Sequence, residues 1–249
     1  MSRVNATVQG KPMIGRFFSR KTPPRAGGGK VVQGLDELVE HTSGVVRRWA
    51  ETPYYDAVEK NALTQWTGII EPYLKGEKVS FKSVCEIAVG HGRMTDILLQ
   101  RSDKVIGVDP LQENIDFCAE RFAGNPKLTL IRNDGVTLKE IDSGSVTFLF
   151  CWDSMVHFDS DVVRHYLREA ARVLVPGGYF FTHHSNRDAG PCDDFQKAPH
   201  ARNFMTVPLF QHYACKEGLI PVRHEAIDWG RGEKFFEKLD GLALVQKPR

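Results

Sequence analysis

Between residues 83 and 185 of this 249-residue chain, short strand-like segments alternate with segments that have the pattern of a helix. Apolar residues fill the strand-like segments, whereas in the others they recur every three or four positions. Such alternation is typical of a parallel sheet whose crossover helices cover both faces. We therefore expect a doubly wound α/β domain, with strands at 83–89, 104–109, 127–132, 145–151 and 177–185 and helices at 93–101, 112–122 and 160–174.

Two further strand-like segments, 220–230 and 240–247, follow a helical pattern at 208–218. No helical pattern separates these two segments, so they should pair in antiparallel fashion and complete a mostly parallel, seven-stranded sheet. Two helical patterns precede the sheet and predict an N-terminal helical cap. We thus divide the chain into a basic arm (1–33), a helical cap (34–78) and a sheet domain (79–249).

Basic residues are concentrated at the amino-terminal end of the chain. Residues 1–30 hold seven of the 33 Lys and Arg residues and none of the 31 Asp and Glu residues, so the remainder has 26 basic and 31 acidic side chains. A mildly acidic body is not suited to binding nucleic acid. The Pro- and Gly-rich arm is typical of a solubilising tail, with a targeting segment or an anion-contacting arm as alternatives.

Neither a membrane segment nor a secretion signal is visible in the sequence. No apolar run approaches the ~20 residues that span a bilayer, and the chain does not open with a signal-peptide pattern. The five Cys residues lack the spacing of a zinc site or a disulfide framework. These features favour a reducing compartment, and we expect a cytoplasmic protein.

The first strand of the predicted sheet runs into a glycine-rich turn, E-I-A-V-G-H-G at 86–92. Ligands of doubly wound sheets bind beyond the carboxyl ends of the strands, where Gly90 and Gly92 would let the backbone approach a ligand closely. Asp109 ends the next strand, about twenty residues later, from which a carboxylate can bind the hydroxyls of a ribose. Arg93 stands where a dinucleotide site has its third glycine. The pattern therefore predicts a nucleoside cofactor without a pyrophosphate.

Over residues 80–247 the chain resembles the class I S-adenosylmethionine-dependent methyltransferases. The acidic residue and glycine motif of that family are matched at 86–92, where Ala88 replaces the first glycine and adds only a methyl group. Asp109 matches the family's ribose-binding acid, and Asp134 matches an acid placed against the adenine amino group. Two later segments also match, the fourth strand with its exit loop, FLFCWDSMVHF (148–158), and the turn into the fifth strand, RVLVPGGYFF (172–181).

This resemblance implies a Rossmann-like fold with S-adenosyl-L-methionine as the cofactor. Glu86 should lie near the methionyl ammonium and be held by that cation and by backbone amides of its own turn, since a buried carboxylate needs such partners. Trp152 should pack against the cofactor. The cofactor-binding residues implied are Glu86, Ala88, Gly90, Gly92, Arg93, Asp109, Pro110, Asn133, Asp134, Gly135 and Trp152.

The loop after the fourth strand contains Asp153 and His157, on the side where a methyl acceptor should lie. A hydroxyl acceptor must lose a proton, and a histidine titrates near neutrality. We expect His157 to be the base and Asp153 to fix its tautomer; the alternatives are a histidine that orients a loop and an aspartate that binds a metal. Because no spacing demands a metal, none is predicted, although ligands could come from Asp153, His183 or His184, and Asp193 or Asp194.

Contacts with the acceptor are expected from a lid ahead of the sheet and from the segment after the fifth strand. Two neighbouring histidines at a strand end point to opposite faces, so at most one readily faces the site. A long loop with basic and amide groups suits a hydroxyl-rich or anionic ligand. The residues concerned are Tyr54 and Tyr55 in the lid, His183 and His184 at the strand end, and Asn186 and Arg202 in the loop; Trp66 should instead lie on the core face of its helix.

Residues 152–186 look most similar to bacterial methyltransferases associated with sugar and polysaccharide O-methylation. We therefore expect methyl transfer to a hydroxyl of a small, hydroxyl-rich acceptor. The alternatives are an N-methyltransferase of a small amine or a nucleic-acid base and a non-catalytic nucleoside-binding protein. Cys-Trp-Asp-Ser at 151–154 stands where enzymes that methylate base amines carry Asn/Asp-Pro-Pro-aromatic, which argues against a base. The missing third glycine disfavours a nicotinamide dehydrogenase.

Overall fold

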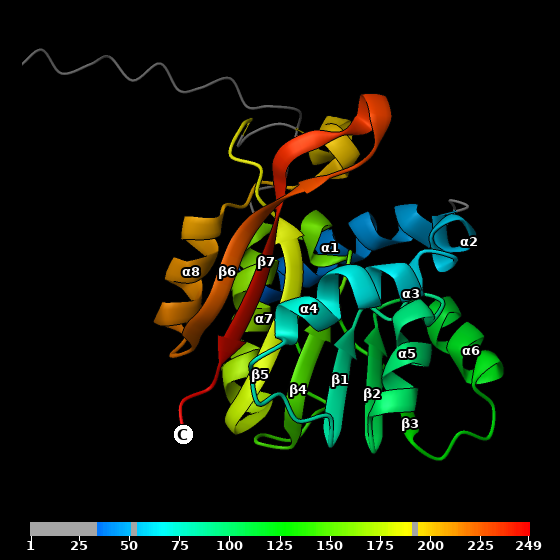
Figure 1. Cartoon of the computed structure of the whole chain (residues 1–249). Helices are drawn as coiled ribbons and strands as arrows, with labels where there is room; N and C mark the ends of the chain where they lie inside the picture. The colour runs from blue at the N-terminus through cyan, green and yellow to red at the C-terminus, as the bar shows by residue number, and fades with distance from the viewer. Residues whose placement is uncertain (1–33, 51–53, 191–193) are drawn as a thin grey trace, which may run out of the picture.

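The computed structural model describes residues 34–50, 54–190 and 194–249, and it contains one seven-stranded sheet with helices on both faces (Figure 1). The predicted basic arm (1–33) lies outside the described residues. The strands lie in the order β3-β2-β1-β4-β5-β7-β6. Their bounds are β1 (Ser83–Ile87), β2 (Lys104–Asp109), β3 (Leu128–Arg132), β4 (Val146–Cys151), β5 (Leu174–Ser185), β6 (Ile220–Trp229) and β7 (Phe236–Gln246).

The sheet is parallel except at one edge. Strands β1 to β5 pair in parallel, whereas β7 runs antiparallel to both β5 and β6. The strand order therefore reverses between β1 and β4, where Val84 is in register with Phe148. In sheets of this kind, ligands bind beyond the carboxyl ends of the strands at the reversal. The predicted doubly wound α/β fold with antiparallel pairing at its end is confirmed.

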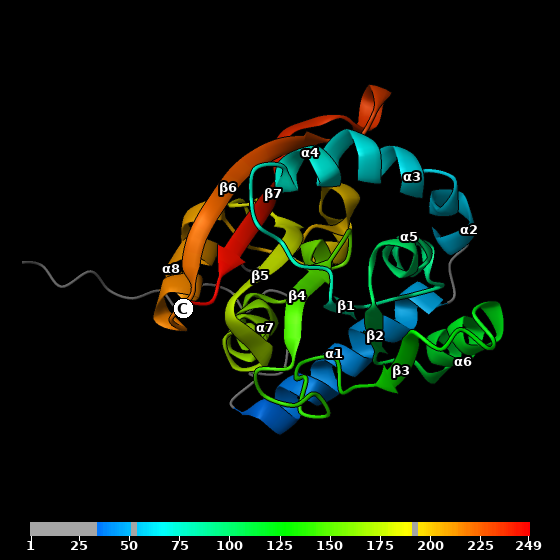
Figure 2. The same cartoon turned by 60° about the horizontal axis from the view of Figure 1, so that its bottom comes forward.

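The two faces of the sheet carry different helices (Figure 2). One face is covered by α1, α7 and α8, and the other by α3, α4 and α5, while α6 lies beside β2 and β3. The helices are α1 (Leu35–Ala50), α2 (Tyr54–Glu59), α3 (Ala62–Gln65), the π-helix η1 (Trp66–Ile70), α4 (Glu71–Leu74), α5 (Arg93–Arg101), α6 (Gln112–Arg121), α7 (Ser160–Val173) and α8 (Val207–Lys216). Short 3₁₀ helices lie at Met155–His157, Phe195–Lys197, Pro199–Ala201 and Gly232–Lys234.

Each face of the sheet has its own apolar core. Neighbouring residues of a strand point to opposite faces, so Phe180 joins the core under α7 and Phe181 joins the core under α4. Trp66 is only 1% exposed within the second core, as predicted. Leu38 of α1 belongs to the first core. The helices of residues 34–78 are therefore divided between the two faces of the sheet.

Two of the buried cysteines belong to the first core. Cys85 and Cys151 are buried free thiols in the first core, where each packs as a small apolar side chain. Across the described ranges, no helix combines the length and the apolar character needed to cross a bilayer.

Candidate active site

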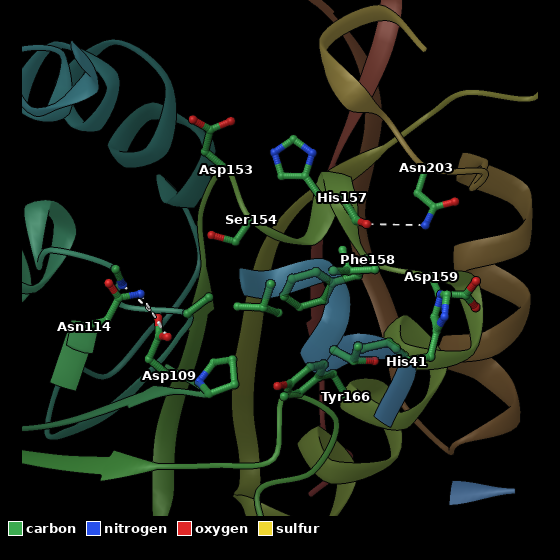
Figure 3. Close-up of a pocket in the computed structure, with 18 of the residues that line it drawn as sticks. His41, Asp109, Asn114, Asp153, Ser154, His157, Phe158, Asp159, Tyr166 and Asn203 are labelled. Atoms are coloured by element: carbon green, nitrogen blue, oxygen red, sulfur yellow. Dashed lines mark hydrogen bonds between the residues drawn. The ribbon is translucent and has the colours of Figure 1, made fainter. Parts of the chain in front are cut away.

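A cavity opens above the carboxyl ends of β1, β2 and β4, where the strand order reverses (Figure 3). The empty space within it, including solvent at its open mouth, is about 900 Å³. The described residues that line it come from α1, α2, α6, α7, the turns after β1, β2 and β3, the segment between β4 and α7, and the segment before α8. They are His41, Thr42, Val45, Val46, Tyr55, Ala88, Gly90, Asp109, Pro110, Asn114, Gly135, Asp153, Ser154, His157, Phe158, Asp159, Val162, Tyr166 and Asn203.

The turn between β1 and α5 has a left-handed backbone at three positions. Gly90 has a φ of 53°, and Gly92, the N-cap of α5, has a φ of 81°. A Cβ on Gly90 would lie 2.5 Å from Cε1 of Tyr55, so only glycine lets this ring cover the turn. Ala88 has a φ of 59°, a conformation that strains a residue with a Cβ by about 1–2 kcal/mol. Alanine at this position therefore adds backbone strain as well as the methyl group noted in the sequence.

Asp109 is held in the cavity wall by three hydrogen bonds. Its Oδ2 accepts from the backbone N–H of Gly90 at 3.0 Å, and its Oδ1 accepts from the backbone N–H of Leu111 and from Nδ2 of Asn114, each at 3.0 Å. Burial raises the pKa of Asp109 above its usual range, and these bonds oppose that rise. Each carboxylate oxygen can accept more than one bond, so Asp109 retains the capacity to bind a ribose hydroxyl.

Tyr55 of α2 covers the glycine turn. Its ring stacks on His91, with centroids 4.1 Å apart, and His91 stacks in turn on Phe117 at 4.0 Å. The Tyr55 hydroxyl accepts a hydrogen bond of 3.1 Å from Asn114. Burial raises the pKa of Tyr55 to about 12, so this hydroxyl keeps its proton. Tyr55 thus lies where the predicted lid should be; the side chain of Tyr54 lies outside the described residues.

Glu86 lies in β1, buried and outside the described lining of the cavity. The hydroxyl of Thr95 in α5 donates to its Oε2 at 2.6 Å. Burial raises the pKa of Glu86 to about 8, so the carboxyl group is largely protonated at neutral pH. The partner found is therefore a side-chain hydroxyl, in place of the turn amides expected from the sequence.

The turn after β3 brings one residue of the predicted Asn-Asp-Gly motif to the cavity, Gly135. Asp134 instead accepts bonds from the backbone N–H and the hydroxyl of Thr137, each at 2.6 Å. Burial opposes ionisation of Asp134, but these bonds lower its pKa overall. Asn133 donates to the Tyr166 hydroxyl at 3.1 Å. In this structure both Asp134 and Asn133 stabilise the turn; the adenine contact of Asp134 and the cofactor-binding role of Asn133 stay predictions.

His157 is a neutral imidazole with a defined tautomer. Its Nδ1 lies 2.8 Å from the carbonyl oxygen of Ala201. Because a carbonyl only accepts, Nδ1 carries the proton and Nε2 is the basic nitrogen of the neutral ring. Burial, with the charge of Arg202, lowers the pKa of His157 to about 4. The Ala201 carbonyl therefore fixes the tautomer, which is the role that the sequence analysis assigned to Asp153.

Asp153 lies at the end of β4 with a left-handed backbone, at a φ of 55°. Its Oδ2 accepts a hydrogen bond of 2.9 Å from Nη2 of Arg93, whose Nη1 donates to Gln65 at 3.0 Å. Arg93 thus bonds to Asp153 and to Gln65 of α3. Asp153 and His157 lie together at one end of the cavity, and Asp109 lies at the other (Figure 3).

Several residues predicted to contact a ligand lie behind the cavity wall. His184 shares a hydrogen bond of 2.7 Å with His224, and the Asn186 amide donates to the Lys238 carbonyl at 2.8 Å. Trp152 donates to Gln65 at 3.0 Å. The residues outside the described lining are Glu86, Gly92, Arg93, Asn133, Asp134, Trp152, His183, His184, Asn186 and Arg202.

The cavity also contains residues that the sequence analysis did not single out. The sequence could have indicated Asn114, because it follows Asp109 by five positions. It lies at the start of a helix that turns back over Asp109, the candidate ribose anchor. The residues contributed by α1 and α7 carry no local signal, because their place depends on how those helices pack on the sheet. Of the possible metal ligands, Asp193 lies outside the described residues, and the described His, Cys, Asp and Glu side chains form no group of three that could hold a metal.

The arrangement suits a nucleoside cofactor with a reacting group at one end. Asp109 and the backbone of Gly90 can hold a ribose, and the apolar wall of Pro110, Phe158 and Val162 can cover a base. The far end then offers a carboxylate and a basic imidazole nitrogen to an acceptor.

Residues 84–178 match the family described as a methyltransferase domain. No curated protein sequence matches the chain. Among solved structures, the S-adenosylmethionine-dependent methyltransferase from Mesorhizobium loti is similar at a TM-score of 0.58 and 14% identity, over 74% of this chain and 97% of that one. A geranyl diphosphate methyltransferase in complex with GPP and sinefungin is similar at a TM-score of 0.54 and 14% identity, over 69% of this chain and 74% of that one. The cyclase SpnF is similar at a TM-score of 0.58 and 12% identity, over 80% of this chain and 84% of that one.

The structural likenesses, at such low identities, concern the fold, and the family match concerns the central strands with the glycine turn. Both agree with the strand order and with the cavity at its reversal. Residues 84–178 are thus a methyltransferase domain, and the chain is a methyltransferase enzyme with the fold of the S-adenosylmethionine-dependent class.

Proposed function

We propose that this enzyme binds S-adenosyl-L-methionine in the cavity and transfers its methyl group to a hydroxyl of a small, hydroxyl-rich molecule, such as a sugar or a glycan. The observation that carries the proposal is that Asp109 lines one end of a single cavity while Asp153 and His157 line the other. A ribose on Asp109 would direct the rest of the cofactor toward that second end. Methyl transfer needs an acceptor oxygen held in line, ~3 Å from the methyl carbon.

The acceptor end of the cavity is polar. Asp153, Ser154, His157 and Asn203 all line it, and each can form hydrogen bonds with hydroxyl groups. His157 presents an unprotonated Nε2 at neutral pH, because its Nδ1 carries the proton. These groups suit an acceptor with several hydroxyls more than an apolar one.

A small amine is the second candidate acceptor. Burial lowers the pKa of His157 to about 4, which makes it a weak base. A deprotonated amine already carries its attacking lone pair and needs no base during the transfer. The weak basicity of His157 therefore favours an amine as the alternative to a hydroxyl.

Calorimetric titration with S-adenosylmethionine, S-adenosylhomocysteine and NAD tests the cofactor. We expect binding of the first two and none of NAD, with affinity at least about tenfold weaker in Asp109→Asn because the carboxylate holds the ribose. Asp103→Asn is the matched control, since Asp103 is exposed ahead of the amino end of β2. Binding of NAD, or of none of the three, would overturn the proposal.

Transfer of a labelled methyl group from S-adenosylmethionine tests the acceptor. The probes are methyl glucoside for sugar hydroxyls, catechol for more acidic hydroxyls and benzylamine for amines. Labelled methyl glucoside supports the proposal, and labelled benzylamine alone supports the second candidate. If the cofactor binds but no probe is labelled, the proposed cofactor site is supported and the proposed acceptor class is wrong.

A further inference from the structure

Behind the cavity wall, buried charged groups link Asp153 to the interior of the sheet. Asp240 on β7 is completely buried and accepts bonds of 2.8 and 2.6 Å from Arg202. It also lies 2.9 Å from Nε2 of His183, which is completely buried on β5. The other ring nitrogen of His183, Nδ1, lies 3.9 Å from Oδ1 of Asp153. One buried imidazole therefore lies between a cavity carboxylate and an interior carboxylate.

These contacts assign the first proton of His183. A carboxylate only accepts, so Nε2 carries the proton that is donated to Asp240. In the neutral ring Nδ1 is then a bare acceptor, and among the described residues it has no hydrogen-bond partner although it is buried. A buried acceptor without a hydrogen bond destabilises the folded protein unless a donor reaches it. A second proton on Nδ1 would allow a charge-assisted bond to Asp153 after a small movement.

We infer that Asp153 and His183 together take up the proton that the acceptor hydroxyl loses during methyl transfer, while Asp240 holds the imidazole in place. This inference rests on the proposed function. As the new O–CH₃ bond forms and the S–CH₃ bond breaks, the hydroxyl proton passes to Oδ1 of Asp153 and from there to Nδ1 of His183. The positive charge that sulfur loses reappears on the imidazolium. The proton returns through Asp153 to solvent when the product has left.

His183 is better placed to hold this proton than His157 is. Nδ1 of His157 donates to a neutral carbonyl, and burial with the charge of Arg202 lowers the pKa of His157 to about 4. His183 has a carboxylate partner on its far nitrogen, the arrangement that stabilises an imidazolium in hydrolases with a Ser-His-Asp triad. An imidazole also holds a proton more tightly than a carboxylate does in water. His183 acts through Asp153 and is a positioning residue, whereas Asp153 touches the cavity.

Charged and titratable groups approach His183 from each element packed around it. Its ring packs against Trp152 and Trp229, with centroids 4.7 and 4.5 Å away, and is shielded from solvent. The charged and titratable groups are Asp240 on β7, Asp153 after β4, Arg202 ahead of α8, Arg93 of α5 behind Asp153, and His184 on the opposite face of β5.

Nitrogen NMR of protein labelled at histidine, with S-adenosylhomocysteine bound, tests the inference without an acceptor. We expect His183 in the Nε2–H tautomer while its ring is neutral, with Nδ1 gaining a proton as the pH is lowered. In Asp153→Asn the midpoint should fall by about one pH unit or more, because an opposite charge near Nδ1 is lost. His183→Gln identifies the signal; if that variant does not fold, correlation to the assigned backbone identifies it.

Asp159→Asn is the matched control for the NMR experiment. Asp159 also lines the cavity, but its carboxylate accepts from the backbone N–H of Asp161 at the start of α7. It should leave the His183 midpoint unchanged. An Nδ1–H tautomer of neutral His183, or the same midpoint in wild type and Asp153→Asn, would overturn the inference.

The pH dependence of turnover provides the second test, with whichever hydroxyl probe is methylated. In His183→Gln we expect kcat to fall by about 100-fold or more with little change in KM, and the acidic limb of the pH profile to be lost. His157→Gln should retain that limb. Loss of the limb in His157→Gln and its retention in His183→Gln would return the role to His157. If no probe is methylated, the proposed function fails separately, while the NMR outcome still decides whether His183 accepts a proton beside Asp153.

Discussion

The side-chain amide of Asn114 donates a hydrogen bond of 3.0 Å to Oδ1 of Asp109 from the first turn of α6. The same nitrogen lies 3.1 Å from the hydroxyl of Tyr55, which covers the glycine turn. A single amide thus orients the candidate ribose anchor and also holds the candidate lid. Its loss should affect both the shape of the site and its closure.

We predict that Asn114→Ala weakens the binding of S-adenosylhomocysteine by about tenfold, or about 1.4 kcal/mol. A hydrogen bond to a charged group contributes about 1.5–3 kcal/mol, and Asp109 retains its two backbone donors, so a partial loss is expected. Calorimetric titration measures the change. Gln112→Ala is the control, because the exposed Gln112 lies on the same helix and donates to Asp116 on the helix surface. Equal affinities of wild type and Asn114→Ala would contradict the prediction.

The strained backbone at Ala88 gives a second prediction. Ala88→Gly should increase the free energy of unfolding by up to about 1 kcal/mol, because relief of a left-handed alanine exceeds the entropy that glycine adds to the unfolded chain. Urea unfolding at neutral pH measures it. Ala171→Gly, inside α7, should instead decrease the free energy of unfolding by about 1 kcal/mol. A decrease of similar size in both variants would show that the conformation of Ala88 carries no strain.

The fold was predictable from the sequence because its signals are local. Strand and helix periods appear within single segments, and the glycine turn and Asp109 follow directly from the ends of β1 and β2. For this reason Gly90 and Asp109, which line the cavity, could be singled out from the sequence, while their cofactor-binding role stays a prediction.

The acceptor half could not be located in this way, because its contacts join distant segments. The carbonyl that fixes the tautomer of His157 lies 44 residues later, on Ala201. Asp240 meets His183 across a separation of 57 residues, through the antiparallel pairing of β5 and β7. Sequence spacing indicates that two such residues exist, but only the packing of loops on the sheet determines whether they meet.

The buried pair of His184 and His224 predicts a loss of stability in acid. Nδ1 of His184 donates to the Ser185 carbonyl, so its Nε2 accepts from Nε2 of His224 at 2.7 Å. Burial lowers the pKa of His224 to about 4, from 6.5 in the unfolded chain. Above pH 6.5 the His224 side chain is neutral in both the folded and the unfolded chain, so it does not affect stability. As the pH falls below 6.5, His224 binds a proton in the unfolded chain alone, and the folded protein loses stability.

His224→Gln should reduce this acid loss, because glutamine can still donate to His184 but does not titrate. Between pH 7 and 4.5 we expect the wild type to lose about 2–3 kcal/mol more than His224→Gln, from 1.36 kcal/mol for each pH unit. Urea unfolding at the two pH values measures the difference. The exposed His212 provides the control, since His212→Gln should lose as much as wild type. An unchanged acid loss in His224→Gln would exclude the pair as its cause.

Glu86 predicts the opposite dependence on pH. Burial raises its pKa from 4.5 to about 8, so the native state keeps a proton that the unfolded chain has lost. The contribution of Glu86 to the free energy of unfolding is complete below pH 4.5 and decreases as the pH rises through 8.

Glu86→Gln cannot titrate, and its amide oxygen can still accept from Thr95. The free energy of unfolding of Glu86→Gln relative to wild type should therefore increase from pH 5.5 to pH 8, by on the order of a few kcal/mol. Urea unfolding at both pH values tests this, with the exposed Glu71→Gln as the control whose difference from wild type stays constant. A constant difference for Glu86→Gln as well would mean that the carboxylate is ionised in the native protein, stabilised by partners other than Thr95.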